Sequence, residues 1–201
     1  MLKKLTKKAK KIIFRLIWIN KFGKFGKNSY LNAPLRINNS QNIFIGNNVT
    51  IQYKAWLAAK PINEKSSSKL IIKDGCNIGD FNHIYATKMI LIEECVLTAS
   101  RVYITDNLHS YEDILTPISK QPVKQLSPVR VGAHSWLGEN VCVIGVNIGK
   151  HCVIGANSVV TKDIPDYSVA VGIPAHIIKR YNFETQQWEK TAPDGTFVIL
   201  E

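Results

Sequence analysis

The most regular feature of the chain is an aliphatic residue at every sixth position. The clearest series, which contains a single five-residue step, consists of Val131, Leu137, Val143, Ile148, Ile154 and Val160. Shorter runs with the same spacing are Ile45 and Ile51, then Ile72, Ile78 and Ile84, then Ile92, Thr98 and Ile104. A period of six fits neither an amphipathic helix, with period 3.6, nor an alternating strand, with period 2. The spacing therefore predicts short strands separated by corners.

Three such six-residue units form one coil of a triangular prism, in which each aliphatic residue points inward and stacks on its equivalents in the neighbouring coils. Burial of each Val, Leu or Ile contributes about 1.5–3 kcal/mol, so the stack itself can supply the core. Prisms of this type wind left-handed, against the usual right-handed crossover between parallel strands. We therefore predict a mainly β fold, a left-handed parallel β-helix over residues 30–175.

Small residues occupy two further places in the six-residue unit. Glycine follows four of the aliphatic positions, at Gly132, Gly138, Gly149 and Gly155. We attribute these glycines to corners whose backbone a side chain would strain. A small or β-branched residue stands at the fifth place of the unit in Ser135, Val141, Cys152 and Ser158.

Two stretches interrupt the six-residue spacing. Residues 60–69 are polar and predict a loop that leaves the prism at a corner. Residues 105–130 contain Pro117, Pro122 and Pro128 and no six-residue unit, which predicts a long extruded loop. Long loops on a rigid scaffold are where function tends to lie. Residues 176–201 follow the last unit, and we expect them to form a tail that caps the prism.

Basic charge is concentrated at one end of the chain. Of 26 Lys and Arg residues, thirteen lie within residues 1–63, and Glu64 is the first acidic residue. The remainder is close to neutral. This argues against a nucleic-acid-binding domain, because such a domain carries basic residues across its folded surface.

Residues 1–25 of this basic end predict an amphipathic helix, with apolar residues at helical spacing among lysines. Arg15 interrupts the apolar stretch and no small-residue cleavage site follows, which argues against a signal peptide. The whole stretch of residues 12–19, Arg15 included, has eight residues, fewer than the roughly twenty that span a bilayer. Two interpretations stay open: residues 1–20 lie on an anionic membrane surface, or the helix packs on its own domain with a solvated lysine face.

Two segments resemble the hexapeptide-repeat acetyltransferases, a family that includes galactoside, maltose and nodulation-factor acetyltransferases and surface-polysaccharide O-acetyltransferases. The run from Pro128 to Arg180 is similar to the C-terminal half of these enzymes, PVRVGAHSWLGENVCVIGVNIGKHCVIGANSVVTKDIPDYSVAVGIPAHIIKR. The run from Ile104 to Tyr111, ITDNLHSY, is similar to their catalytic segment. The resemblance covers about residues 40–180 and implies a homotrimer that transfers an acetyl group from acetyl-CoA.

His109 stands where the family carries its catalytic histidine. An imidazole with an ordinary pKa near 6.5 suits the removal of a proton from an alcohol at neutral pH. A sugar hydroxyl is a poor nucleophile toward a thioester unless its proton leaves as the new bond forms. The alternative is an ordinary exposed loop histidine, and the surrounding motif favours the general base.

The resemblance also implies contacts to acetyl-CoA along an outer groove between neighbouring subunits. The matching positions are Glu139, Ala156, Thr161, Lys162, His176 and Lys179. Lys162 and Lys179 suit nucleotide phosphates, although either could be a solvated surface lysine. His176 replaces an arginine that is common in the family, and Trp136 either covers the pantetheine arm or packs between subunits.

No metal is expected. The four cysteines, Cys76, Cys95, Cys142 and Cys152, show no CxxC pairing, which predicts reduced thiols rather than disulfides or a zinc site. The γ-type carbonic anhydrases share the prism and bind zinc, but their pair of histidines five residues apart is missing here.

The leading hypothesis is an acetyl-CoA-dependent O-acetyltransferase acting on a surface-polysaccharide or lipid-linked sugar. Tyr85 stands where the galactoside and maltose enzymes carry an acceptor-binding asparagine, which disfavours a simple disaccharide acceptor. The expected location is cytoplasmic, with peripheral contact at the inner face of the membrane. Two alternatives stay open: an N-acetyltransferase of an amino sugar, and a non-catalytic trimeric scaffold.

Overall fold

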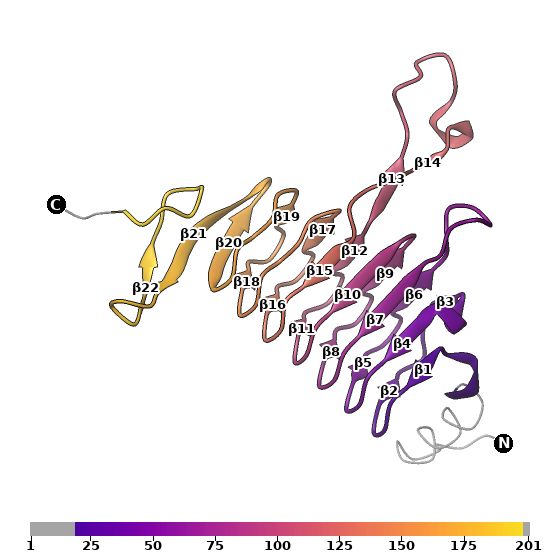
Figure 1. The fold of residues 1–201 in the computed structure, drawn as a ribbon, viewed down its shortest axis with the longest axis horizontal. Coiled ribbons are helices and arrows are strands. Elements are labelled where there is room, and N and C mark those ends of the chain that lie inside the picture. Colours follow the sequence, from indigo (N-terminus) through magenta and orange to yellow (C-terminus); the bar gives the residue numbers. More distant parts are fainter. Residues whose placement is uncertain (1–18, 199–201) are drawn as a thin grey trace.

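A computed structural model describes residues 19–198 of the chain. Its regular structure is almost entirely β-strand, wound as a left-handed parallel β-helix into a three-sided column (Figure 1). The three sides of the column are three sheets, called A, B and C. The chain passes from sheet A to sheet B to sheet C and then begins the next coil on sheet A. The predicted fold class is therefore confirmed.

Each face of the prism is one sheet. Sheet A contains β1 (Lys24–Phe25), β4 (Ile43–Ile45), β7 (Lys69–Ile72), β10 (Met89–Ile92) and β15 (Val129–Val131). Sheet B contains β2 (Tyr30–Leu31), β5 (Thr50–Ile51), β8 (Asn77–Ile78), β11 (Leu97–Thr98), β16 (Trp136–Leu137), β18 (Val153–Ile154), β20 (Ser168–Gly172), β21 (Ala175–Asn182) and β22 (Gln187–Lys190). Sheet C contains β3 (Arg36–Asn38), β6 (Trp56–Ala59), β9 (His83–Ala86), β12 (Tyr103–Thr105), β17 (Cys142–Ile144) and β19 (Val159–Val160).

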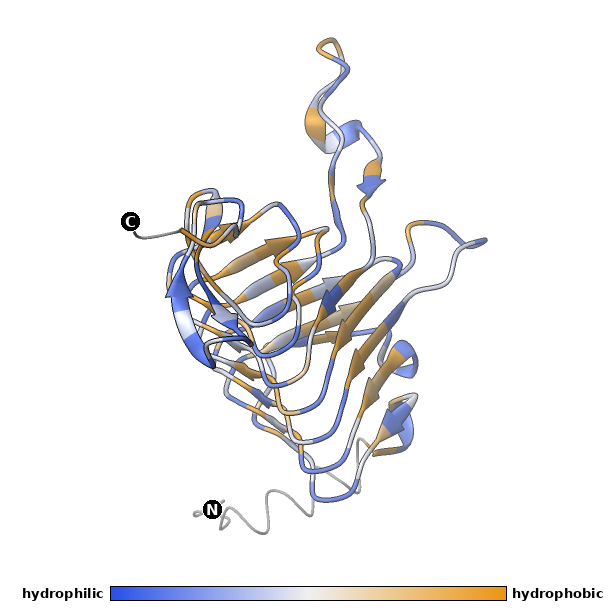
Figure 2. Cartoon of the chain, turned by 60° about the vertical axis from the view of Figure 1, so that its left-hand side comes forward, coloured by the Kyte–Doolittle hydropathy of each residue, from blue (hydrophilic) through white to orange (hydrophobic). Residues whose placement is uncertain are grey.

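The predicted inward-facing residues form the core. In sheet A, Ile72 pairs in register with Ile45 on one side and Ile92 on the other, and all three are fully buried. Thr98 takes an inward position in sheet B and is also buried. Its hydroxyl donates to Asn82 at 2.8 Å and accepts from the Gly79 amide at 3.0 Å, which satisfies the polar group inside an apolar column. Figure 2 shows hydrophobic residues recurring in the strands of successive coils.

The structure corrects the reason given for the glycines. The four predicted corner glycines lack a positive φ, whereas non-glycine residues at corners, such as Asn48 and Phe81, adopt left-handed conformations with φ of 54° and 56°. A Cβ at Gly132 would run into the backbone of Gly149 in the next coil, and one at Gly138 would meet the amide nitrogen of Ala156 at 2.7 Å. Close approach between coils, rather than backbone strain, therefore excludes a side chain at these positions.

Both interruptions of the spacing leave the prism at the edge where sheet C turns into sheet A (Figure 1, Figure 2). The first is loop 60–68, between β6 and β7. The second lies between β12 and β15 and is a hairpin, in which β13 (Asn107–His109) pairs antiparallel with β14 (Val123–Gln125). A short 3-10 turn, η3 (Ile118–Lys120), lies beyond this ribbon. The hairpin adds regular structure that the proline-rich sequence did not indicate.

The two ends of the column differ. Residues 1–18, which hold most of the predicted amphipathic helix, lie outside the described residues. The described part begins with a 3-10 turn, η1 (Ile19–Lys21), and β1 already pairs with β4, so the first coil starts before residue 30. A second 3-10 turn, η2 (Ser40–Asn42), precedes β4. At the other end β20, β21 and β22 pair antiparallel and extend sheet B. Among residues 19–198, no helix is long and apolar enough to cross a bilayer.

Candidate active site

A cavity of about 540 Å³ lies on the outer face of sheet C, between the two interruptions. Strands β6, β9 and β12 form its floor, through Trp56, His83 and Tyr103. Lys60 to Ile62 of loop 60–68 line one side, and the base of the hairpin lines the other. The site is therefore placed where two loops leave the same edge of a rigid column.

The floor contains a continuous stack of side chains from four coils. Arg36, Trp56, His83 and Tyr103 occupy one row of register across β3, β6, β9 and β12. The Arg36 guanidinium carbon lies 4.6 Å from the centroid of the Trp56 ring, and the Trp56 and His83 rings stack at 4.0 Å with an interplanar angle of 10°. The Tyr103 ring follows at 5.0 Å from His83. The stack fixes the floor, because each ring is held by a neighbour in the next coil.

His83 is the first of two imidazoles in the cavity wall. Its Nε2 atom is buried and has no hydrogen-bond partner. Burial, together with the positive charge of Arg36, lowers the pKa of His83 below its ordinary value. A neutral, stacked ring whose nitrogen is covered suits a structural wall better than a proton acceptor.

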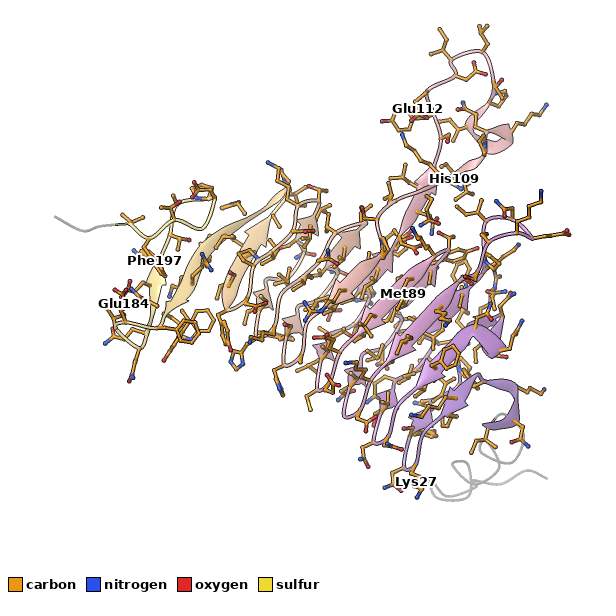
Figure 3. All side chains as sticks on the ribbon, viewed as in Figure 1. Lys27, Met89, His109, Glu112, Glu184 and Phe197 are labelled. Carbon is orange, nitrogen blue, oxygen red and sulfur yellow. The ribbon has the colours of Figure 1, made fainter. Side chains whose placement is uncertain are left out.

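His109 is the second imidazole, and it is exposed at the rim. It is the last residue of β13, opposite Val123 of β14, at the base of the extruded hairpin (Figure 3). All three residues of β13, Asn107, Leu108 and His109, line the cavity. The structure therefore gives the predicted general base access to a molecule bound in the cavity.

Asp106 attaches the hairpin to the prism. Its carboxylate is fully buried and accepts hydrogen bonds from the backbone amides of Thr87, Lys88 and Met89 at 2.7 to 2.8 Å. The Thr87 hydroxyl adds a fourth bond at 2.8 Å. Because His109 follows three residues later, this anchoring at the β9–β10 corner determines where the imidazole stands.

Further contacts hold the two arms of the hairpin together. The Gln125 side-chain amide donates to the Asp106 carbonyl at 2.7 Å, and the Leu126 amide donates to the same carbonyl at 2.8 Å. Farther out, Lys124 forms an ion pair with Glu112, and this contact lowers the pKa of Glu112 to about 2. The base of the hairpin is thus held by bonds from both of its arms.

The residues predicted to contact acetyl-CoA separate into three groups. Lys162 and His176 line one hollow of about 750 Å³ at the C-terminal end of the prism. Trp136 and Lys179 line a second hollow of about 490 Å³ on the outer face of sheet B, together with Trp188. The register explains the second pair, because Trp136 and Lys179 belong to one outward row of that sheet.

The third group lies at corners. Glu139 forms an ion pair with Arg101 at 2.9 Å, and its other oxygen accepts from the Ser100 amide at 3.3 Å. Ala156 and Thr161 are exposed and line neither hollow. A further hollow of about 810 Å³ is lined by both His176 and Lys179, so the first two groups adjoin each other. The corner residues lie apart from them. Residues 19–198 contain no group of three or more potential metal ligands.

Sequence reasoning missed the aromatic floor and the anchoring carboxylate. Trp56, His83 and Tyr103 lie in separate six-residue units with insertions of different length between them, so their spacing carries no period. Asp106 had a detectable signal, because it follows directly after the last strand before the extruded loop. A carboxylate at such a point can accept hydrogen bonds from the backbone amides of the equivalent corner one coil earlier.

Comparison with known proteins identifies the family of the chain. Residues 128–162 match a family model described as the hexapeptide repeat of succinyl-transferase. The chain is 37% identical over 164 residues to the putative lipopolysaccharide biosynthesis O-acetyl transferase WbbJ of Escherichia coli, a match that covers 78% of this chain and 81% of that protein.

Two solved structures share the fold. AntD, an N-acyltransferase from Bacillus cereus in complex with dTDP and 3-hydroxybutyryl-CoA, superposes with a TM-score of 0.70 and 22% identity, covering 92% of this chain and 93% of that one. A hexapeptide-repeat acetyltransferase from Vibrio cholerae in complex with acetyl coenzyme A gives a TM-score of 0.56 and 22% identity, covering 90% and 80%. Since the similarity to WbbJ extends over most of both chains, the protein belongs to the family of hexapeptide-repeat acetyltransferases.

Proposed function

We propose that this protein transfers an acetyl group from acetyl-CoA to a sugar hydroxyl of a surface polysaccharide or lipid-linked saccharide, with His109 as general base. The observation that carries the proposal is the exposed imidazole at the rim of the cavity on sheet C. The similarity to WbbJ, which is named for lipopolysaccharide biosynthesis, supports a saccharide acceptor and an oxygen ester.

In the reaction, His109 takes the proton of the acceptor hydroxyl while the oxygen attacks the thioester carbonyl. The new carbon–oxygen bond forms, the carbon–sulfur bond breaks, and CoA leaves as a thiol after the imidazolium returns the proton. Holding the acceptor hydroxyl and the thioester next to each other at His109 supplies the high effective concentration that orientation provides. The neighbouring His83 takes no part in proton transfer, because its Nε2 is covered.

For acetyl-CoA we propose two binding regions that follow the hollows at the C-terminal end. Lys162 and Lys179 would bind nucleotide phosphates, with His176 beside them, and Trp136 would cover the pantetheine arm or pack against a neighbouring subunit. Glu139 would need to give up its ion pair with Arg101 to reach the cofactor, so it is the weakest member of the proposed set. Ala156 and Thr161 would contribute through their corner backbone.

A homotrimer with three sites would complete this arrangement, with each hairpin reaching toward a neighbouring chain. The part of the hairpin beyond the ribbon supports this proposal, because Ile114 and Leu115 are 93% and 89% exposed and Ile118 is also exposed. Such apolar side chains gain by burial in an interface. Sedimentation measurements of the wild type should give a trimer, and a monomer would contradict the proposal.

A cytoplasmic location at the inner face of the membrane belongs to the same proposal. Residues 1–20 would form the basic amphipathic helix that binds anionic lipid. Deletion of residues 1–20 should abolish binding to anionic vesicles and leave acetyl transfer to a soluble acceptor intact. If vesicle binding is unchanged, the segment has no role as a membrane anchor.

Product analysis tests the reaction itself. The purified protein, incubated with acetyl-CoA and a panel of nucleotide-linked and lipid-linked saccharides, should give an acetylated product from which mild alkali removes the acetyl group. An ester behaves in this way, whereas an amide survives. An alkali-stable product would establish N-acetylation instead, and absence of CoA binding by calorimetry would favour the non-catalytic scaffold.

A further inference from the structure

The positive charge around the cavity on sheet C is distributed unevenly. Between residues 19 and 73 the chain has nine Lys and Arg residues, and Glu64 is the only acidic residue. This segment supplies the N-terminal side of the cavity, through β6 and loop 60–68. Toward the C-terminus, several exposed basic residues, including Arg101, Arg130 and Lys150, form ion pairs with carboxylates.

Two cations on the N-terminal side of the cavity have no such partner within residues 19–198. Lys60 follows β6 directly, is exposed, and lines the cavity. Arg36 lies against the Trp56 ring, which also lines the cavity, and it has no carboxylate partner in the described chain. Stacking on an aromatic face holds a guanidinium in place and leaves its N–H donors free for an anion. The charge of Arg36 also reaches into the cavity wall, where it contributes to lowering the pKa of His83.

The opposite side of the cavity has the reacting group. His109 and loop 60–68 leave the same edge of the prism two coils apart, through β12 and β6. Neighbouring strands are about 4.8 Å apart, which separates the two departure points by about 10 Å. The one buried carboxylate near His109, that of Asp106, is fully bonded to backbone amides and the Thr87 hydroxyl. A single sugar ring with a phosphate on its anomeric oxygen matches this spacing, with the hydroxyl at His109 and the phosphate at Lys60.

We propose that the acceptor carries a phosphate or diphosphate group on the sugar that is acetylated, and that Lys60 and Arg36 bind this group at the N-terminal side of the cavity. The inference rests on the proposed acetyl transfer and names the acceptor as a glycosyl phosphate or diphosphate. Lys60 supplies a mobile ammonium and Arg36 a fixed guanidinium, and both form charge-assisted hydrogen bonds with phosphate oxygens. A neutral glycan would leave these cations without a function.

Calorimetric titration of the full-length protein with inorganic pyrophosphate tests the anion site. Saturating CoA is present throughout, so that phosphate sites for the cofactor are filled. We expect saturable binding that weakens about tenfold in Lys60→Ala and in Arg36→Gln, because each removes charged hydrogen bonds. Lys69→Ala is the matched control, since Lys69 is an exposed lysine on the adjacent sheet A.

Absence of saturable binding of pyrophosphate, or an equal loss of affinity in Lys69→Ala, would overturn the proposal. Arg36→Lys keeps the positive charge and should keep both the circular dichroism spectrum and most of the pyrophosphate affinity. This variant shows whether the loss in Arg36→Gln comes from the missing charge or from misfolding.

Two competitors distinguish the source of the phosphate. Displacement of pyrophosphate by UDP indicates a nucleotide-linked sugar, and displacement by undecaprenyl diphosphate in detergent indicates a lipid-linked one; displacement by neither contradicts a diphosphate acceptor. The His109→Ala variant should still bind pyrophosphate, so a chain that binds pyrophosphate but transfers no acetyl group contradicts only the proposed reaction. Unchanged transfer to phosphorylated acceptors by Lys60→Ala and Arg36→Gln contradicts only the anion site.

Discussion

Inside the prism each coil repeats the one beside it, whereas at the edge between sheets C and A the coils differ from one another. The interior holds aliphatic residues such as Ile84, Ile104 and Val143, which pair in register and are fully buried. At the edge, loop 60–68 follows β6, the hairpin follows β12, and only a short corner follows β17. The cavity with His109 lies at this irregular edge.

This contrast explains how a repetitive fold can carry an active site. Identical neighbours give a stiff column, because every inward residue meets the same packing in the next coil. Such uniformity offers no distinct cavity. Insertions at one corner add side chains of new types without disturbing the inward stack, so the scaffold and the site can be changed separately. Mutations at the two places should therefore separate activity from stability.

The largest expected effect belongs to His109→Ala. Loss of a general base lowers turnover on the order of 10²–10⁴-fold, while the melting temperature and the affinity for CoA stay unchanged because the side chain is exposed at the rim. Steady-state detection of the released thiol, together with thermal denaturation, provides the measurement. Full activity in this variant would remove the mechanism.

Ile84→Ala tests the interior of the prism. Ile84 is fully buried and pairs with Leu57 and Ile104, directly beneath the cavity floor. The free energy of unfolding should fall by about 2–5 kcal/mol, the usual cost of truncating a buried isoleucine. Urea denaturation measures this loss. If turnover of the folded protein falls as far as it does in His109→Ala, scaffold and site are not separable.

Asp106→Asn tests the junction between the two regions. An amide in place of the carboxylate would point N–H donors at backbone amides that now donate to Asp106, at a cost of about 1.5–3 kcal/mol. The hairpin should loosen, with faster proteolysis within residues 107–125 and turnover lowered on the order of tenfold. His109→Ala should show no change in proteolysis, and equal cleavage in the two variants would contradict the anchoring role.

A pair of glycine substitutions compares close approach with backbone conformation. A Cβ at Gly79 would collide with the backbone of Ala99 in the next coil, so Gly79→Ala should cost about 1–3 kcal/mol. Gly75 has a φ of 74°, and Asn48 occupies the same type of corner, so Gly75→Asn should cost less than about 1 kcal/mol. Equal losses of the free energy of unfolding would show that coil contacts do not govern these positions.

The smallest effect concerns pH. Because the pKa of His83 is lowered in the folded protein, the unfolded chain takes up the proton more readily, and stability falls as pH drops below the ordinary histidine value near 6.5. The slope of the unfolding free energy between pH 5 and 6.5 should decrease in His83→Phe, by at most about 1.4 kcal/mol per pH unit. The variant and the wild type should have parallel stability curves above pH 7. An unchanged slope below pH 6.5 would contradict the burial of this imidazole.

The six-residue spacing of aliphatic residues determines the prism. An inward residue at every sixth position predicts strands and corners, and the residues predicted to face inward, from Ile45 to Val160, are buried as expected. The five-residue step before Ile148 does not break the stack, because Ile148 still pairs with Val131 across sheet A. Predicting His109 needed a second source, the similarity of the segment around it to a known family.

Contacts between outward-facing residues depend on how the coils stack in three dimensions. Inward positions see the same surroundings in every coil, so a one-dimensional repeat specifies them. Outward positions have no such constraint, and the insertions of unequal length hide the register that brings Trp56, His83 and Tyr103 into one stack. The same register pairs Glu139 with Arg101 and places Lys60 and His109 on one cavity. The site therefore depends on the packing between coils, which leaves no regular spacing in the sequence.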